Sequence, residues 1–353
     1  MKAKLSIAVL SATALLSACG GGGSSTSGST PSTPTVPTPP VQPSTALQLT
    51  VPTPTYPAGS PALSAFNAIN AARLAYGVGA LAQNTQLDTA ATNHANYMLD
   101  GFLSGNYTVV GHTEVATNQG FTGVTPDNRI QAAGYKPLID GETVAYFISE
   151  TGVASDPGVV SVNNWLSGPY HRFGVLDTYR EIGLSDATTS AIANSGGLTN
   201  LFVADYGVSQ SAGASQLPAS TWIGVWPLNQ AIGVNYGAAG ESPNPITSAN
   251  GACYGYPVSI QIANGLTLST TSFTMIETVS GATVAVQLST YTTDVNPSLA
   301  RLNSAYIIPL KPLKLGTQYT VNFVGAGASA INMAWTFTTT PQNNQNVYGC
   351  NPS

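Results

Sequence analysis

The chain has 353 residues, of which 43% are hydrophobic and only 7% are charged, and its formal net charge is -5 at pH 7. So few basic residues exclude the electrostatic footprint of a nucleic-acid-binding protein and a polybasic patch for anionic lipids. The length is ample for one or two buried cores, so the composition indicates a folded protein with no nucleic-acid partner.

The amino terminus, residues 1–18, has the pattern of an export signal. Two lysines precede an uncharged stretch over residues 5–18, which is shorter than the roughly 20 apolar residues of a membrane-spanning helix. The stretch ends in Leu16-Ser17-Ala18-Cys19, which resembles the lipobox of bacterial lipoproteins. We therefore expect lipidation of Cys19 and attachment to the cell envelope, at the outer membrane because Gly20 follows, or an extracellular location. An ordinary secretory signal with an incidental cysteine is the alternative.

Residues 19–58 are rich in Gly, Ser, Thr and Pro and contain no periodic apolar face. Gly/Ser-rich sequence is flexible and Pro-rich sequence is extended, and neither can bury a core. This segment is predicted to be a linker that holds a folded domain away from the membrane. The lipid is the only attachment to the membrane that we expect.

Residues 59–210 predict an α+β domain. Apolar residues recur at helical spacing in its first part, and strand-like segments come later without βαβ alternation. Residues 104–145 are expected to be mostly loop. The expected helices cover residues 61–76, 87–102, 128–133 and 159–166, and the expected strands cover residues 180–184 and 201–206.

Residues 220–353 predict an all-β sandwich, because short alternating segments follow one another at regular spacing between turn residues. The region also resembles bacterial Ig-like domains, in its opening Trp226-Pro227-Leu228-Asn229 and its closing Trp335-Thr336-Phe337-Thr338. That resemblance implies a spacer or adhesion module. The expected strands cover residues 258–262, 272–277, 283–289, 305–309, 319–324 and 333–338.

The chain has three cysteines, Cys19, Cys253 and Cys350. If Cys19 carries lipid, the other two remain as a pair in an oxidising compartment, so a disulfide between them is expected. It would close a loop of about 100 residues, worth about 4–5 kcal/mol in the chain-entropy model. Two unrelated buried thiols are the alternative.

Histidine is the scarcest residue that carries chemistry, with three copies. His94 falls on the apolar face of an expected helix, where a buried structural role is favoured. His112 and His171 fall in or beside loops. Glu142 and Glu181 each precede small or apolar residues, as a buried acid would.

The order of these motifs resembles the CAP superfamily (cysteine-rich secretory proteins, antigen 5 and pathogenesis-related 1), in its bacterial SCP-domain branch. The resemblance covers about 150 residues, with Thr143 where the family usually has Asn. The matching pieces are Asn70-Ala71-Ala72-Arg73, the helix with Leu87, Ala91, His94 and Met98, the loop His112-Thr113, Gly134-Tyr135 with Gly141-Glu142-Thr143-Val144-Ala145, Trp165 to Leu176 with His171-Arg172, and Tyr179-Arg180-Glu181-Ile182-Gly183.

The resemblance implies an α-β-α sandwich with a cleft that holds His112, Glu142, His171 and Glu181. Three uses of this tetrad stay open. It suits a divalent metal such as zinc, it suits acid–base catalysis by a Glu–His pair, or it is a polar network that stabilises the fold.

We expect a non-catalytic module that binds a metal and a ligand at the cell envelope, the ligand being a lipid or an envelope or host-surface component. No serine or cysteine lies in a recognisable nucleophile context, which disfavours an enzyme. A metal-assisted hydrolase of peptides or cell-wall material and a structural or adhesion protein are the alternatives. The sequence leaves the oligomeric state open.

Overall fold

The computed structural model describes residues 44–149, 156–190, 198–238, 240–247 and 253–342. The predicted signal peptide, most of the predicted linker, and Cys19 and Cys350 lie outside the described residues. Pro43–Ser353 form one compact unit. Among the helices in the described ranges, none combines the length and the hydropathy that crossing a membrane requires.

The first half of this unit is built on one four-stranded sheet in the order β1-β3-β4-β2, in which β1 and β3 run parallel and the other pairs antiparallel. Its strands are β1 (Ala82–Gln83), β2 (Pro137–Ser149), β3 (Glu181–Thr189) and β4 (Leu198–Ser209). Its helices are α1 (Pro61–Tyr76), α2 (Thr85–Leu103), η1 (Tyr107–Val109, a 3-10 turn), α3 (Pro126–Ala132), α4 (Pro157–Ser167) and α5 (Pro169–Val175).

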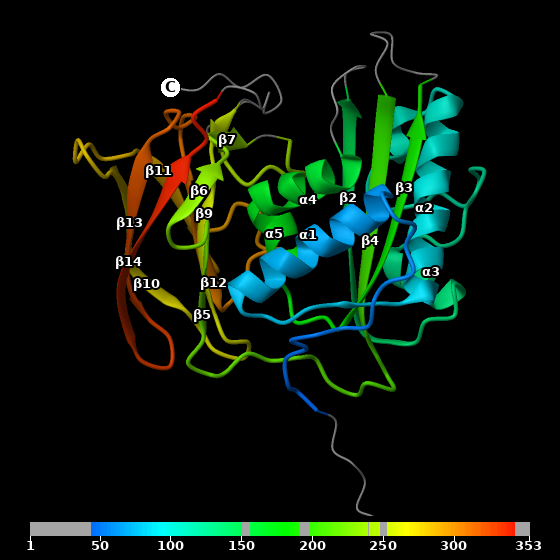
Figure 1. The fold of residues 1–353 in the computed structure, drawn as a ribbon, viewed down its shortest axis with the longest axis horizontal. Helices are drawn as coiled ribbons and strands as arrows, with labels where there is room; N and C mark the ends of the chain where they lie inside the picture. Colours follow the sequence, from blue (N-terminus) through cyan, green and yellow to red (C-terminus); the bar gives the residue numbers. More distant parts are fainter. Residues whose placement is uncertain (1–43, 150–155, 191–197, 239, 248–252, 343–353) are drawn as a thin grey trace, which may run out of the picture. The chain divides into compact units, whose positions relative to one another are not determined.

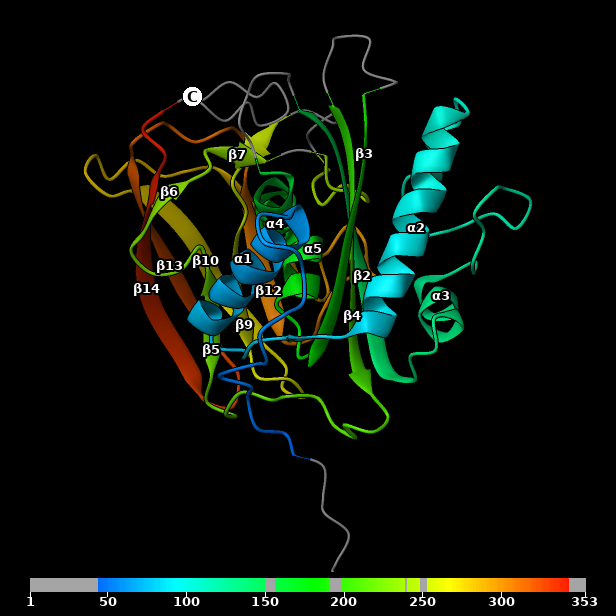
Figure 2. The ribbon, with the colours of Figure 1, turned by 45° about the vertical axis from the view of Figure 1, so that its right-hand side comes forward.

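The helices cover both faces of this sheet (Figures 1 and 2). α2 and α3 pack on one face, and α1, α4 and α5 pack on the other. Each face has its own apolar core: Phe66, Ile69 and Trp165 are buried on the α1 side, whereas Met98 and Phe102 are buried on the α2 side. This arrangement agrees with the expected α+β class and with helices on both sides of a sheet.

The predicted helices are confirmed because their start and stop signals act locally. The side chain of Ser60 accepts a hydrogen bond from the Leu63 amide at the start of α1, and Pro61 occupies its first turn. Gly77 ends the helix at φ 89°, a left-handed conformation that favours glycine. The side chain of Asn84 caps α2 in the same way as Ser60 caps α1.

Some elements of this half differ from the prediction. Residues 137–145, expected to be loop, belong to β2, and residues 169–175, for which no element was expected, form the short helix α5. Among the described residues, β2 is an edge strand whose one pairing partner is β4. Its polar Asp140-Gly141-Glu142 lacks an apolar alternation, so the strand depends on its long-range partner rather than on local propensity.

The second half contains two four-stranded sheets, β10-β13-β14-β6 and β11-β12-β9-β5, and the pair β7-β8. Both sheets contribute to one apolar core, which includes Ile260, Phe323 and Trp335. All six expected strands are confirmed, and the Ig-like assignment stays a prediction. The strands are β5 (Ile223–Trp226), β6 (Ala231–Val234), β7 (Gly237–Ala238), β8 (Tyr254–Gly255), β9 (Val258–Ile262), β10 (Ser269–Glu277), β11 (Val286–Thr290), β12 (Ser304–Pro309), β13 (Gln318–Ala326) and β14 (Ala330–Thr339).

Two further predictions meet the structure in part. Residues 44–58, expected to be free linker, bind the folded unit: Gln48 donates to the carbonyls of Ala80 and Arg180, both at 2.9 Å. Cys253 is disulfide-bonded, but its predicted partner Cys350 is outside the described residues, so that pairing stays a prediction.

The two halves share buried polar contacts. Arg172 on α5 is fully buried, and its guanidinium donates to the Ser259 hydroxyl and the Pro257 carbonyl of the second half, both at 2.9 Å. Phe173 on α5 belongs to an apolar cluster with Tyr306 and other residues of the second half. Burying these groups together couples the halves, because each would expose apolar surface or unpaired polar atoms if they separated.

Candidate functional site

The structure brings together two of the four predicted tetrad residues, His112 and Glu142. His112 follows η1 in a loop, and its Nδ1 lies 2.8 Å from Glu142 Oε1 on β2. The Glu142 side chain is fully buried, whereas that of His112 is 46% exposed. Because a carboxylate only accepts hydrogen bonds, the His112 ring donates from Nδ1, and this bond fixes the orientation of its exposed face.

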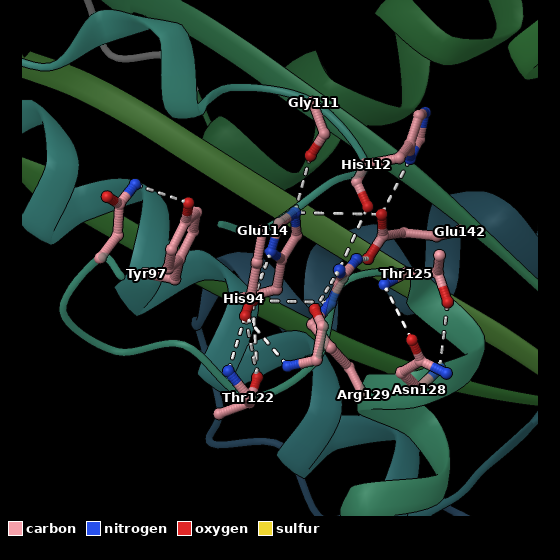
Figure 3. A network of polar contacts seen from close by, with 12 residues as sticks. His94, Tyr97, Gly111, His112, Glu114, Thr122, Thr125, Asn128, Arg129 and Glu142 are labelled. Atoms are coloured by element: carbon pink, nitrogen blue, oxygen red, sulfur yellow. Dashed lines mark hydrogen bonds and ion pairs between the residues drawn. The ribbon is translucent and has the colours of Figure 1, made fainter. Parts of the chain in front are cut away.

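Arg129 of α3 forms an ion pair with Glu142, as Figure 3 shows. Arg129 is buried and its guanidinium lies 2.6 Å from Glu142 Oε2. Arg129 also donates to the carbonyl of His112 at 3.1 Å, so one side chain fixes both members of the pair. Burial alone would raise the pKa of Glu142, but the His112 hydrogen bond and the charges of His94 and Arg129 hold it below its usual range.

His94 lies at the centre of the same network and is fully buried, which confirms the structural role predicted for it. Its Nδ1 lies 2.9 Å from Glu114 Oε1 and its Nε2 lies 2.7 Å from the Gly111 carbonyl oxygen. The partners on both sides of the ring are oxygen atoms, so both ring nitrogens are engaged within the network. The cation Arg129 lies between the two acids, 3.6 Å from Glu114 Oε1 and 2.6 Å from Glu142 Oε2.

A fifth group, Asp205 on β4, lies opposite Glu142 in the register of β2 and β4. It is fully buried, and neither carboxyl oxygen has a hydrogen-bond partner among the described residues. Burial, and then the charge of Glu142, raise the pKa of Asp205 well above its usual range. Burial beside Glu142 therefore favours the neutral form of this carboxyl.

Glu181, the third tetrad residue, belongs to a different set of contacts at the start of β3. Its Oε1 accepts from Asn84 at 2.9 Å and its Oε2 accepts from the Tyr135 hydroxyl at 2.6 Å. Asn84 also caps α2, so Glu181 fixes the beginning of that helix to the sheet.

His171, the fourth, pairs with an acid from the other half of the chain. Glu241 Oε1 accepts from the backbone amide of His171 at 2.9 Å and lies 3.0 Å from His171 Nδ1. The Glu241 side chain is 2% exposed and that of His171 is 19% exposed. The partner of His171 is therefore Glu241, not Glu142 or Glu181.

These contacts leave the predicted tetrad without a common set of free metal ligands. All four carboxylate oxygens of Glu142 and Glu181 already accept hydrogen bonds or ion pairs within the chain. Within the described ranges, no three His, Cys, Asp or Glu side chains are grouped so as to hold a metal ion. The donor set present does not fit a four-ligand zinc site, because its acids are used internally and its histidines have different partners.

Sequence reasoning missed Glu114, Arg129, Asp205 and Glu241. Two of them carried a local signal. Glu114 follows His112 by two residues, and Asp205 directly follows the apolar run of residues 201–204, which marks a buried polar group. Arg129 and Glu241 had no such signal, because only the tertiary structure brings α3 to β2 and the second half to α5.

Solved structures resemble only part of this chain. Two structures of PcoC, a copper resistance protein from Escherichia coli, align with 33% of this chain and with 95% and 93% of their own. They are 17% and 18% identical to it, with TM-scores of 0.22 and 0.19, values too low to carry an argument about this chain.

A comparison with curated proteins gave no match. Residues 66–206 match the family model of the cysteine-rich secretory protein family, CAP. The matched segment runs from Phe66 on α1 to Tyr206 on β4 and includes all four predicted tetrad residues. The match and the layered fold together support the assignment of residues 66–206 to the CAP superfamily.

Proposed function

We propose that this chain is an exported, lipid-anchored CAP-domain protein that acts as a non-catalytic binding module at the cell envelope, with its two halves working as one unit. The proposal rests on one observation: every carboxylate oxygen of Glu142 and Glu181 accepts a hydrogen bond or forms an ion pair within the same chain. Acids held in this way position helices and loops, and they are not free to coordinate a metal or to exchange a proton with a substrate.

One observation favours a second candidate, a hydrolase. His112 is exposed and oriented by a buried carboxylate, which is how a general base is often held. No serine, threonine or cysteine side chain among the described residues is hydrogen-bonded to His112, so the pair lacks a nucleophile partner.

The envelope location is tested by Cys19→Ser in the full-length protein, expressed in a bacterial host with a labelled fatty acid. We expect the wild type to incorporate the label and to fractionate with membranes, and the variant to do neither. Cys253→Ser is the matched control and should keep both properties. A labelled Cys19→Ser protein, or an unlabelled wild type, would contradict the lipid anchor.

The non-catalytic assignment is tested with full-length protein in detergent, by elemental analysis after equilibration with zinc and by mass spectrometry of a peptide and cell-wall library. Because no common ligand set is free, we expect no stoichiometric zinc and no cleavage products, in the wild type as in His112→Ala. If the wild type binds one equivalent of zinc and His112→Ala does not, the expectation that the chain has no zinc site is wrong. Products that His112→Ala abolishes would establish the hydrolase.

A further inference from the structure

A small cavity lies where the two halves meet beside His171. Its volume is about 80 Å³, and it is lined by His171, Trp165 and Asn164 of the first half and by Glu241 and Tyr254 of the second, among others. A single water needs roughly 10–15 Å³ by this measure. The cavity therefore has room for a compound, or the end of a compound, with a few heavy atoms.

Glu241, the acid in this cavity, is buried, and only one of its two carboxyl oxygens has a hydrogen-bond partner among the described residues. Glu241 Oε1 accepts from the amide and the ring of His171, whereas Oε2 is buried and has no hydrogen-bond partner among the described residues. The Glu241 carboxyl packs directly on Gly168, where an added Cβ would lie 2.5 Å from the carboxyl carbon. The glycine thus makes room for a carboxylate whose second oxygen remains available as an acceptor.

The neighbouring groups set the polarity that a ligand must have. Nδ1 of His171 faces Glu241, and in the tautomer that carries its single ring proton on Nδ1, Nε2 is a second acceptor. Trp165 Nε1 is a buried donor that has no partner among the described residues. Among the residues that line the cavity, Glu241 is the one acid and none is a lysine or an arginine.

We propose that this cavity binds a small primary ammonium group, held by Glu241 and His171, with Trp165 donating to an oxygen on the adjacent carbon. The inference rests on the proposed function, that the chain binds a ligand rather than converts one. An ammonium carries three N–H donors and a positive charge, and two of those donors match the unpaired Oε2 of Glu241 and Nε2 of His171. Neither acceptor contacts His112 or Glu142, so the site shares only His171 with the predicted tetrad.

The test is calorimetric titration of the full-length protein with ethanolamine, ethylene glycol and choline. Ethylene glycol replaces the ammonium by a neutral hydroxyl, and choline keeps the charge but removes the N–H donors. We expect saturable one-to-one binding of ethanolamine only. Equal binding of ethylene glycol or choline, or no binding of ethanolamine, would overturn the proposal.

Glu241→Gln keeps the shape of the side chain and removes its charge, so ethanolamine binding should weaken about 10- to 100-fold. Glu277→Gln is the matched control, because it removes the same charge from a surface ion pair with Lys314, and its affinity should equal that of the wild type. If Glu241→Gln unfolds, the test is the NMR resonance of the Trp165 indole N–H in the wild type. Adding ethanolamine should shift this resonance, and an unchanged resonance would contradict the site.

Two sources of the ammonium are distinguished with vesicles, using the Cys19→Ser chain so that its own lipid plays no part. Preference for phosphatidylethanolamine over phosphatidylcholine vesicles would identify a lipid headgroup, and binding of free ethanolamine alone would identify a small solute. Either outcome supports the ammonium site. Absence of both, with no turnover in the library assay, would overturn this inference and leave the non-catalytic assignment intact.

Discussion

Replacing Arg172 by methionine is expected to lower the free energy of unfolding by about 2–4 kcal/mol. Its guanidinium donates to the Leu166 carbonyl at 2.7 Å and to Ser259 and Pro257 across the junction of the halves. Each buried acceptor left unpaired costs about 1–3 kcal/mol, and relief of the buried charge offsets part of the loss. Methionine fills much of the same space, so the loss of hydrogen bonds dominates.

Urea denaturation followed by tryptophan fluorescence measures this effect, since Trp165 lies in the first half and Trp222, Trp226 and Trp335 lie in the second. We expect a single transition in the wild type, and an earlier transition of one half in Arg172→Met. Lys314→Met is the control: it removes a cation from the exposed surface of the second half and should leave the midpoint unchanged. A shift of equal size in both variants would indicate a general effect of charge and would contradict the role of Arg172.

Arg172 is one of several polar side chains of the first half that bond to the second half. Asp177 accepts a hydrogen bond from Arg301 at 2.6 Å, and Tyr170 donates one to Asp294. Further polar side chains of the first half are therefore hydrogen-bonded to the second half. An independent spacer domain would have had a solvated surface here. The second half of this chain instead supplies the acid that binds His171, which makes it part of the site's chemistry.

Local signals predicted most of the fold. Ser60, Pro61 and Gly77 mark the ends of α1 without help from the rest of the chain. The alternation in residues 319–324 and 333–338 likewise marks β13 and β14, which pair along their whole length. β2 was missed because its residues form a strand only when β4 is present as a partner.

The site was harder to predict because resemblance gives residue types and not their partners. His112 and Glu142 do meet, as expected. Glu181 and His171 keep their places in the motifs but bind Asn84, Tyr135 and Glu241. A sequence pattern cannot reveal that Glu241, 70 residues after His171, replaces a tetrad acid as its partner.

Replacing Asp205 by asparagine is expected to stabilise the protein, and to do so more as the pH rises. The pKa of Asp205 is raised in the folded state by burial and then by the charge of Glu142, against a smaller opposing effect of Arg129; the charge of Asp140 contributes least. A raised carboxyl pKa gives stability that is complete below the unfolded pKa near 4 and is lost as the pH rises toward the folded pKa. Asparagine has a similar shape and does not ionise, so the variant avoids this loss.

The measurement is the free energy of unfolding of the wild type and Asp205→Asn at a series of pH values from 4 to 8. The difference between the two free energies of unfolding should be smallest at pH 4. As the pH rises toward the folded pKa of Asp205, this difference should grow by up to about 1.4 kcal/mol per pH unit. Asp127→Asn is the control, because Asp127 bonds Gln131 on the surface of α3, and its difference from the wild type should not grow in this way. A pH-independent difference for Asp205→Asn would mean that Asp205 is not buried in its neutral form, and the charge balance around Glu142 would then need a further cation.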